Sequence, residues 1–197
     1  MIELSFNEAG TLAARVARAC GFSWGLAEDI GRAARALAAR GEPWSQALIV
    51  LAQDAGGFES PSQERLSLWL GMEPDQASIK PICPVRTAAF LADVDGDILD
   101  EPLRLVHVGL PIWLSGLLHA RSAEASYAVD YGLDSLVKVG DVTIVKAAGP
   151  PVSRARDRAE IAPDLLATLA LIAKRLYVPE SERSRRRGAG GGSVDGA

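Results

Sequence analysis

The sequence predicts an α+β fold with an N-terminal helical layer, a central and mostly antiparallel sheet, and a C-terminal helix followed by a flexible Arg/Gly tail. Two observations lead to this class. Over roughly the first 70 residues, apolar side chains recur at helical spacing. From Cys83 to Ala148 the pattern changes to short β-branched runs that Gly, Pro and Asp interrupt, which is typical of strands and turns.

Start and stop signals delimit the N-terminal helices. Ser5 and Glu8 have the spacing of a capping box, Gly21 and Gly41 suit helix ends, and Pro43 suits the first position of a third helix. The apolar stripes between these signals are Ala9, Leu12, Ala13, Val16 and Cys20, then Leu26, Ile30, Ala33, Ala34 and Leu37, and then Ala47, Leu48, Leu51 and Ala55. Their small side chains predict helices whose axes approach closely. A shorter helix is predicted from Ser62 to Leu70.

The later elements alternate between strands, turns and helices. Strands are expected at Leu103–Val108, Ser126–Asp130, Ser135–Val139 and Val142–Ala147. Gly140-Asp141 would form a hairpin turn between the last two strands, and Asp95-Gly96-Asp97 another turn. The segments Thr87–Ala92 and Leu110–Ala120 suit either a helix or a strand. Pro163–Arg175 is the clearest late helix, and we expect it to pack on the sheet.

The domain organisation follows the same change of pattern. Residues 1–72 form the helical part, and residues 73–178 contain the sheet and the C-terminal helix within the same domain. Residues 179–197 form the Arg/Gly-rich tail, whose polar and glycine-rich composition predicts flexibility.

Composition excludes several classes of function. A net charge of −4 argues against duplex nucleic acid as a partner, because phosphate binding needs a basic face. The longest apolar stretch, Leu105–Leu118, contains a histidine and a proline and is too short to span a membrane. Cys20 and Cys83 lie far apart, so a disulfide framework is not indicated and a cytoplasmic, reducing setting fits best.

The candidate catalytic residues are Cys83 and His107. Cys83 lies just before a predicted element start and before Arg86. Both features would lower the pKa of a thiol, so Cys83 is a candidate thiolate nucleophile. His107 could then act as its base. The competing interpretation is that Cys83 is a buried structural cysteine and that His107 has a structural or surface role.

Further residues could bind an anionic ligand. Arg86, Asp93, Arg183 and Arg185 would supply polar contacts, and Gly188 and Gly190 would let the backbone approach closely. Composition alone favours a solubilising tail over this role.

No metal site or cofactor is identified by a motif. The acidic cluster from Asp93 to Glu101 fails the calcium-loop pattern, because Gly96 is misplaced and Arg104 stands where the closing Glu belongs. A solvated turn explains it better. Two histidines alone do not make a metal site.

Several segments resemble an uncharacterised proteobacterial family, the domain of unknown function 3726. The resembling segments are Gly21–Glu28, then Cys83-Pro84 with Ala88, Ala89, Leu91, Ala92 and Asp93, and then Tyr177–Arg185 followed by Gly188-Ala189-Gly190. The resemblance implies no activity. It implies that the tail motif is an integral part of the protein, which folds over its own surface or over a ligand.

Two hypotheses of function follow. In the first, the protein is an enzyme or binder for an anionic small molecule, with a pocket between the helical part and the sheet. In the second, it is a non-catalytic interaction or assembly protein that forms a homodimer and contacts a partner through its basic tail.

Overall fold

A computed structural model describes residues 1–58, 80–93, 102–121, 126–132, 136–147 and 156–177. The elements in chain order are β1 (Ile2–Leu4), α1 (Phe6–Ala19), α2 (Trp24–Ala39), α3 (Trp44–Asp54), α5 (Pro84–Asp93), β2 (Leu103–Gly109), α6 (Pro111–Arg121), β3 (Ser126–Asp130), β4 (Val139–Ala147), β5 (Ala159–Ile161), α7 (Pro163–Ala173) and the short 3₁₀ helix η2 (Lys174–Leu176). The α+β class is therefore confirmed, and both ambiguous segments are helices, namely α5 and α6. The predictions at 62–70, at 95–97 and in the tail lie outside the described residues.

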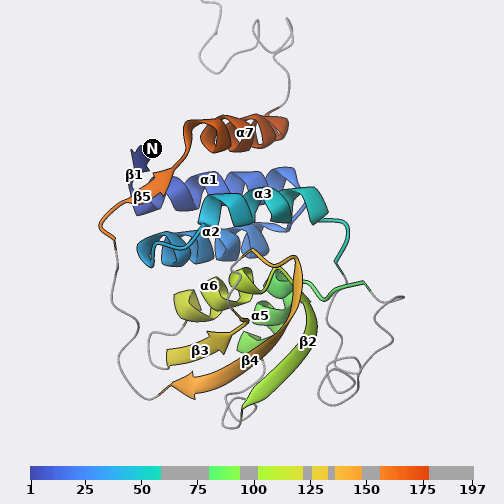
Figure 1. Cartoon of the computed structure of the whole chain (residues 1–197). Coiled ribbons are helices and arrows are strands. Elements are labelled where there is room, and N and C mark those ends of the chain that lie inside the picture. The colour runs from blue at the N-terminus through green and yellow to red at the C-terminus, as the bar shows by residue number, and fades with distance from the viewer. Residues whose placement is uncertain (59–79, 94–101, 122–125, 133–135, 148–155, 178–197) are drawn as a thin grey trace, which may run out of the picture.

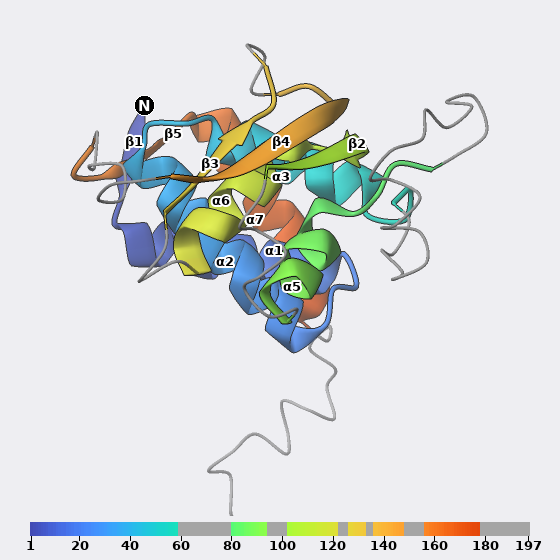
Figure 2. The ribbon, with the colours of Figure 1, turned by 90° about the horizontal axis from the view of Figure 1, so that it is seen from below.

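The helices stack in layers above a small sheet (Figure 1). Helix α7 packs on α1 and α3, and α2 packs on α6, which contacts both α5 and the sheet. The sheet has the order β2-β4-β3 and is antiparallel throughout. Seen from the sheet side, its strands cross over α6, while α5 lies beside them (Figure 2). A second antiparallel pair joins β1 to β5 next to the N-terminal helices.

The predicted capping box and the helix ends at Gly21 and Gly41 are confirmed, whereas Pro43 precedes α3 as its N-cap residue and the helix begins at Trp44. The Ser5 hydroxyl accepts the Glu8 backbone N–H at 3.2 Å, and the Glu8 carboxylate accepts the Ser5 N–H at 2.7 Å. Gly21 and Gly41 both adopt positive φ just after their helices, a conformation that glycine adopts without steric cost.

Helices α1 and α2 approach closely, as their small residues predict. A Cβ atom on Gly31 would lie 2.8 Å from the Gly10 carbonyl oxygen, and one on Gly10 would lie 2.9 Å from the Gly31 carbonyl oxygen. The two backbones therefore touch, and the core beneath them is built from alanines together with Val16, Ile30 and Leu37.

The predicted hairpin turn at Gly140-Asp141 is wrong. Both residues lie inside β4, where Gly140 pairs with Val108. The turn would need left-handed backbone, and neither residue adopts it. Strand β4 continues through both residues, and the irregularity lies in β2, where a bulge between Leu105 and Val108 shifts the register of the β2–β4 pairing.

The predicted packing of the C-terminal helix on the sheet is also wrong. Strand β5 pairs with β1 and returns the chain to the N-terminal helices, so α7 lies against α1 and α3, and it buries Leu169 and Ala173. The sheet packs on α6 instead.

Candidate functional site

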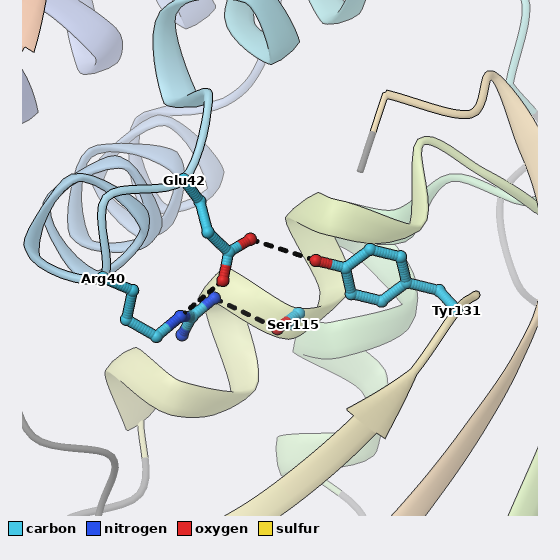
Figure 3. A network of polar contacts seen from close by, with 4 residues as sticks. All are labelled: Arg40, Glu42, Ser115 and Tyr131. Carbon is cyan, nitrogen blue, oxygen red and sulfur yellow. Dashed lines mark hydrogen bonds and ion pairs between the residues drawn. The ribbon is translucent and has the colours of Figure 1, made fainter. Parts of the chain in front are cut away.

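A cluster of polar side chains lies where the α2–α3 turn meets α6 and the end of β3 (Figure 3). Arg40 donates through Nε to Glu42 Oε1 at 2.7 Å and through Nη2 to the Ser115 hydroxyl at 3.1 Å. The Tyr131 hydroxyl donates to Glu42 Oε2 at 3.0 Å. The cluster thus joins segments that are 75 and 89 positions apart in the chain.

Burial and nearby charges shift the pKa values of two groups here, Tyr131 of the cluster and His119. Burial, reinforced by the Glu42 charge, raises the pKa of the Tyr131 hydroxyl far above its ordinary value, which keeps it a hydrogen-bond donor. Burial, followed by the positive charge of Arg40, lowers the pKa of His119, so its imidazole is neutral at pH 7. Within the described part of the chain, Arg40 Nη1 and His119 Nδ1 are buried without a hydrogen-bond partner.

A pocket of about 260 Å³ lies beside Glu42. It is bounded by the α2–α3 turn, the first residue of the chain and the segment around β5. Its lining is Met1, Ala38, Gly41, Glu42, Pro43, Trp44, Ser45, Gln46, Arg156, Glu160 and Ala162. It therefore combines two carboxylates and a guanidinium with an apolar wall.

A second hollow, of about 330 Å³, is a groove between α1 and α2. Its lining is Asn7, Gly10, Thr11, Ala14, Glu28, Gly31, Arg32 and Arg35. Arg35 donates to the Asn7 amide oxygen at 3.3 Å, and Arg32 forms an ion pair with Asp29. Two guanidinium groups one helical turn apart thus border a groove with small residues in its lining.

Cys83 and His107 lie on neighbouring segments. The Ile82 N–H donates to the His107 carbonyl at 3.1 Å, so the backbones before Cys83 and at His107 are adjacent. The Cys83 side chain is only 3% exposed, and burial raises the pKa of its thiol despite the nearby Arg86. A raised pKa reduces the thiolate fraction. His107 has a positive φ of 57° in the β2 bulge, and its N–H donates to the Asp141 carboxylate at 3.2 Å.

Of the other predicted site residues, only Arg86 has a described side chain, and its charge acts on the Cys83 thiol. Arg86 is exposed on α5, and Asp93 ends that helix with a side chain that is not described. Arg183, Arg185, Gly188 and Gly190 lie outside the described residues. The binding roles of these six residues, and the catalytic roles of Cys83 and His107, stay predictions.

The residues that the structure does bring together were not predicted from the sequence. Arg32 lies one helical turn from Glu28, and Arg35 lies one turn beyond Arg32, so helical periodicity could have placed the three residues on one face. No sequence pattern links the members of the polar cluster, because their contacts depend on the tertiary fold. These members are Arg40, Glu42, Ser115 and Tyr131.

The described residues contain no group of three His, Cys, Asp or Glu residues that could hold a metal ion. Across the same ranges, no helix has both the length and the apolar character needed to cross a membrane.

The fold and its hollows define an α+β protein whose N-terminal helices contribute to both candidate sites. Residues 4–52 match the family model described as protein of unknown function (DUF3726). The match confirms the resemblance for the segment that holds α1, α2 and most of α3, including Gly21–Glu28, whereas the two later resembling segments lie outside it. No curated protein and no solved structure matches the chain.

Proposed function

We propose that the protein binds a small anionic metabolite in the groove between α1 and α2. The observation that carries this proposal is the pair of guanidinium groups, Arg32 and Arg35, on the lining of one hollow. Planar guanidinium forks suit carboxylate and phosphate oxygens, and the Asn7 amide and the Thr11 hydroxyl add neutral hydrogen-bonding groups. The proposed site lies within the helical part, whereas the sequence suggested a pocket between this part and the sheet.

Of the two arginines, Arg35 is better placed to bind an incoming anion. The space that a Gly10 side chain would fill is occupied by the Arg35 stem, whose Cγ lies 2.9 Å from an ideal Cβ there. Its one hydrogen bond to a described side chain, to Asn7, is exposed to solvent. A guanidinium has five N–H donors, so most of its donor capacity is available to an incoming anion.

The position of the groove in the chain supports the proposal further. All eight lining residues fall within residues 4–52, the segment that matches the family model. The groove therefore lies wholly within the part of the chain that the family model describes.

The test compares Arg35→Met with Arg15→Met. Methionine keeps an apolar stem over Gly10 and removes the charge, and Arg15 is an exposed arginine of α1 that does not line the groove. Thermal unfolding is followed with inorganic phosphate, citrate and other carboxylates, and with chloride at matched ionic strength. A ligand at a hundred times its dissociation constant adds about 2.7 kcal/mol to the stability.

We expect stabilisation in the wild type and in Arg15→Met, and its loss in Arg35→Met. An absence of stabilisation across the panel, or an equal effect in both variants, would contradict the proposal.

A reducing, cytoplasmic location in a bacterial cell is the second part of the proposal. Both cysteines are free thiols, and Cys20 contacts the Ala52 carbonyl rather than another sulfur. Free thiols of this kind are typical of proteins in reducing compartments. Fractionation of the native host with an antibody against the chain tests the location, and recovery with secreted proteins would contradict it.

One observation favours the alternative, an assembly function through a homodimer. The α7 residue Leu171 is 65% exposed, and Leu176 and Tyr177 beyond it are also exposed. A Leu171→Asp variant that stays folded would lower the mass measured by light scattering if this face joins two copies. An unchanged monomeric mass at all concentrations would exclude that role.

A further inference from the structure

We infer that the pocket beside Glu42 is a second ligand site, and that it takes a small zwitterion of amino-acid size. The ligand carboxylate would lie against Arg156, and its ammonium group would lie against Glu42 or Glu160. This inference does not depend on the proposed function, because the pocket and the α1–α2 groove share no lining residue.

The fold holds Arg156 over the α2–α3 turn. Its backbone N–H donates to the Ala39 carbonyl at 3.1 Å, and its Nε lies 2.9 Å from the place where a Gly41 side chain would begin. The guanidinium pairs with Glu160, and both side chains of this pair are partly exposed. Exposed ion pairs contribute little to stability, so a ligand carboxylate can share the guanidinium at low cost.

Glu42 provides the negative end of the pocket. Its side chain is mostly buried, and Arg40 and Tyr131 each donate to a different oxygen. A carboxylate offers about four acceptor positions, so both oxygens can still accept an N–H from a ligand. The two contacts fix the direction of the carboxylate in advance, which reduces the entropy lost on binding.

The balance of charge favours a dipolar ligand over an ion of one sign. The lining carries both signs of charge: the carboxylates of Glu42 and Glu160, the guanidinium of Arg156, and Met1 with the N-terminal ammonium group. A ligand of one sign would pair at one end and lie against a group of its own sign at the other, whereas a zwitterion pairs at both ends.

The remaining walls suit a short carbon skeleton. Ala38, Pro43 and Trp44 supply apolar surface, and the Trp44 ring is fixed because its Nε1 donates to the Glu160 carbonyl at 3.2 Å. A volume of about 260 Å³ is just below the usual range for drug-sized ligands, which limits the occupant to a small molecule.

The test is calorimetric titration of the full chain with the proteinogenic L-amino acids at about 10 mM, a concentration that detects millimolar affinity. For any amino acid that binds, the amine without its carboxylate and the acid without its amine are titrated in parallel. We expect at least one amino acid to bind, and both single-charge analogues to bind about tenfold more weakly or worse.

The variants are Arg156→Met and its control Arg158→Met, an exposed arginine that does not line the pocket. We expect Arg156→Met to lower the affinity by about tenfold or more, and Arg158→Met to leave it unchanged. Arg35→Met should also leave it unchanged, which separates this site from the groove. The inference is overturned if no amino acid binds, if either single-charge analogue binds as tightly as the amino acid, or if Arg156→Met binds like the wild type.

Discussion

The contact between α1 and α2 leads to a quantitative prediction about Gly31. In a Gly31→Ala variant the new methyl group would lie 2.8 Å from the Gly10 carbonyl oxygen and 3.3 Å from the Ala14 Cβ. The first neighbour is backbone and cannot turn aside, so the two helices must separate. Overpacking of this kind costs about 1–3 kcal/mol. Alanine is also the better helix former by up to about 1 kcal/mol, which offsets part of the cost.

Gly25→Ala in the same helix is the matched control. A Cβ atom there meets nothing within 4 Å, so only the helix propensity changes. Gly25→Ala should therefore be neutral or slightly stabilising, and Gly31→Ala should be about 1–3 kcal/mol less stable than this control. Urea unfolding at constant m-value measures the difference. If Gly31→Ala equals or exceeds Gly25→Ala in stability, the inferred backbone contact between α1 and α2 is wrong.

Three further predictions concern the buried polar and thiol groups. Tyr131→Phe removes the hydrogen bond to Glu42 and should lower the free energy of unfolding by about 1–2 kcal/mol in urea titrations, whereas a loss near zero would show that solvent replaces the bond. The lowered pKa of His119 means that the unfolded chain binds a proton below pH 6.5 that the folded chain does not, so stability should fall more steeply from pH 7 to pH 5 in the wild type than in His119→Gln. Parallel stability curves would contradict this prediction. Buried Cys83 should react with a thiol reagent only on unfolding, while the half-exposed Cys20 reacts earlier, and mass spectrometry of the labelled peptides distinguishes the two.

The sequence was most informative where local chemistry determines the structure. The capping box at Ser5 and the helix ends at Gly21 and Gly41 depend on backbone groups within a few residues of each signal, so they could be predicted without tertiary information. The close packing of α1 on α2 could also be predicted, because glycine and alanine recur at helical spacing on both inner faces.

Local patterns failed where the fold offers a competing use for the same residues. Gly140-Asp141 has the composition of a turn, yet the Asp141 carboxylate accepts the His107 N–H at the bulge of the neighbouring strand. The apolar stripe of α7 could equally have covered a sheet or a helix pair. The pairing of β5 with β1 determines that α7 packs on the N-terminal helices. A strand of three residues is too short to produce a recognisable sequence pattern.

Local sequence patterns also failed to predict which residues form the candidate sites. Cys83 was a candidate because of its sulfur atom, and a cysteine sulfur acts as a nucleophile only if it is ionised and accessible. Burial makes the Cys83 thiol inaccessible and raises its pKa, which disfavours ionisation. The local sequence does not indicate that a residue just before a helix is buried. Glu42 and Glu160 line the same pocket, where the Trp44 indole N–H donates to the Glu160 carbonyl, 116 positions later in the chain. A contact of that span is set by strand pairing and helix packing together, so predicting the site required the fold first.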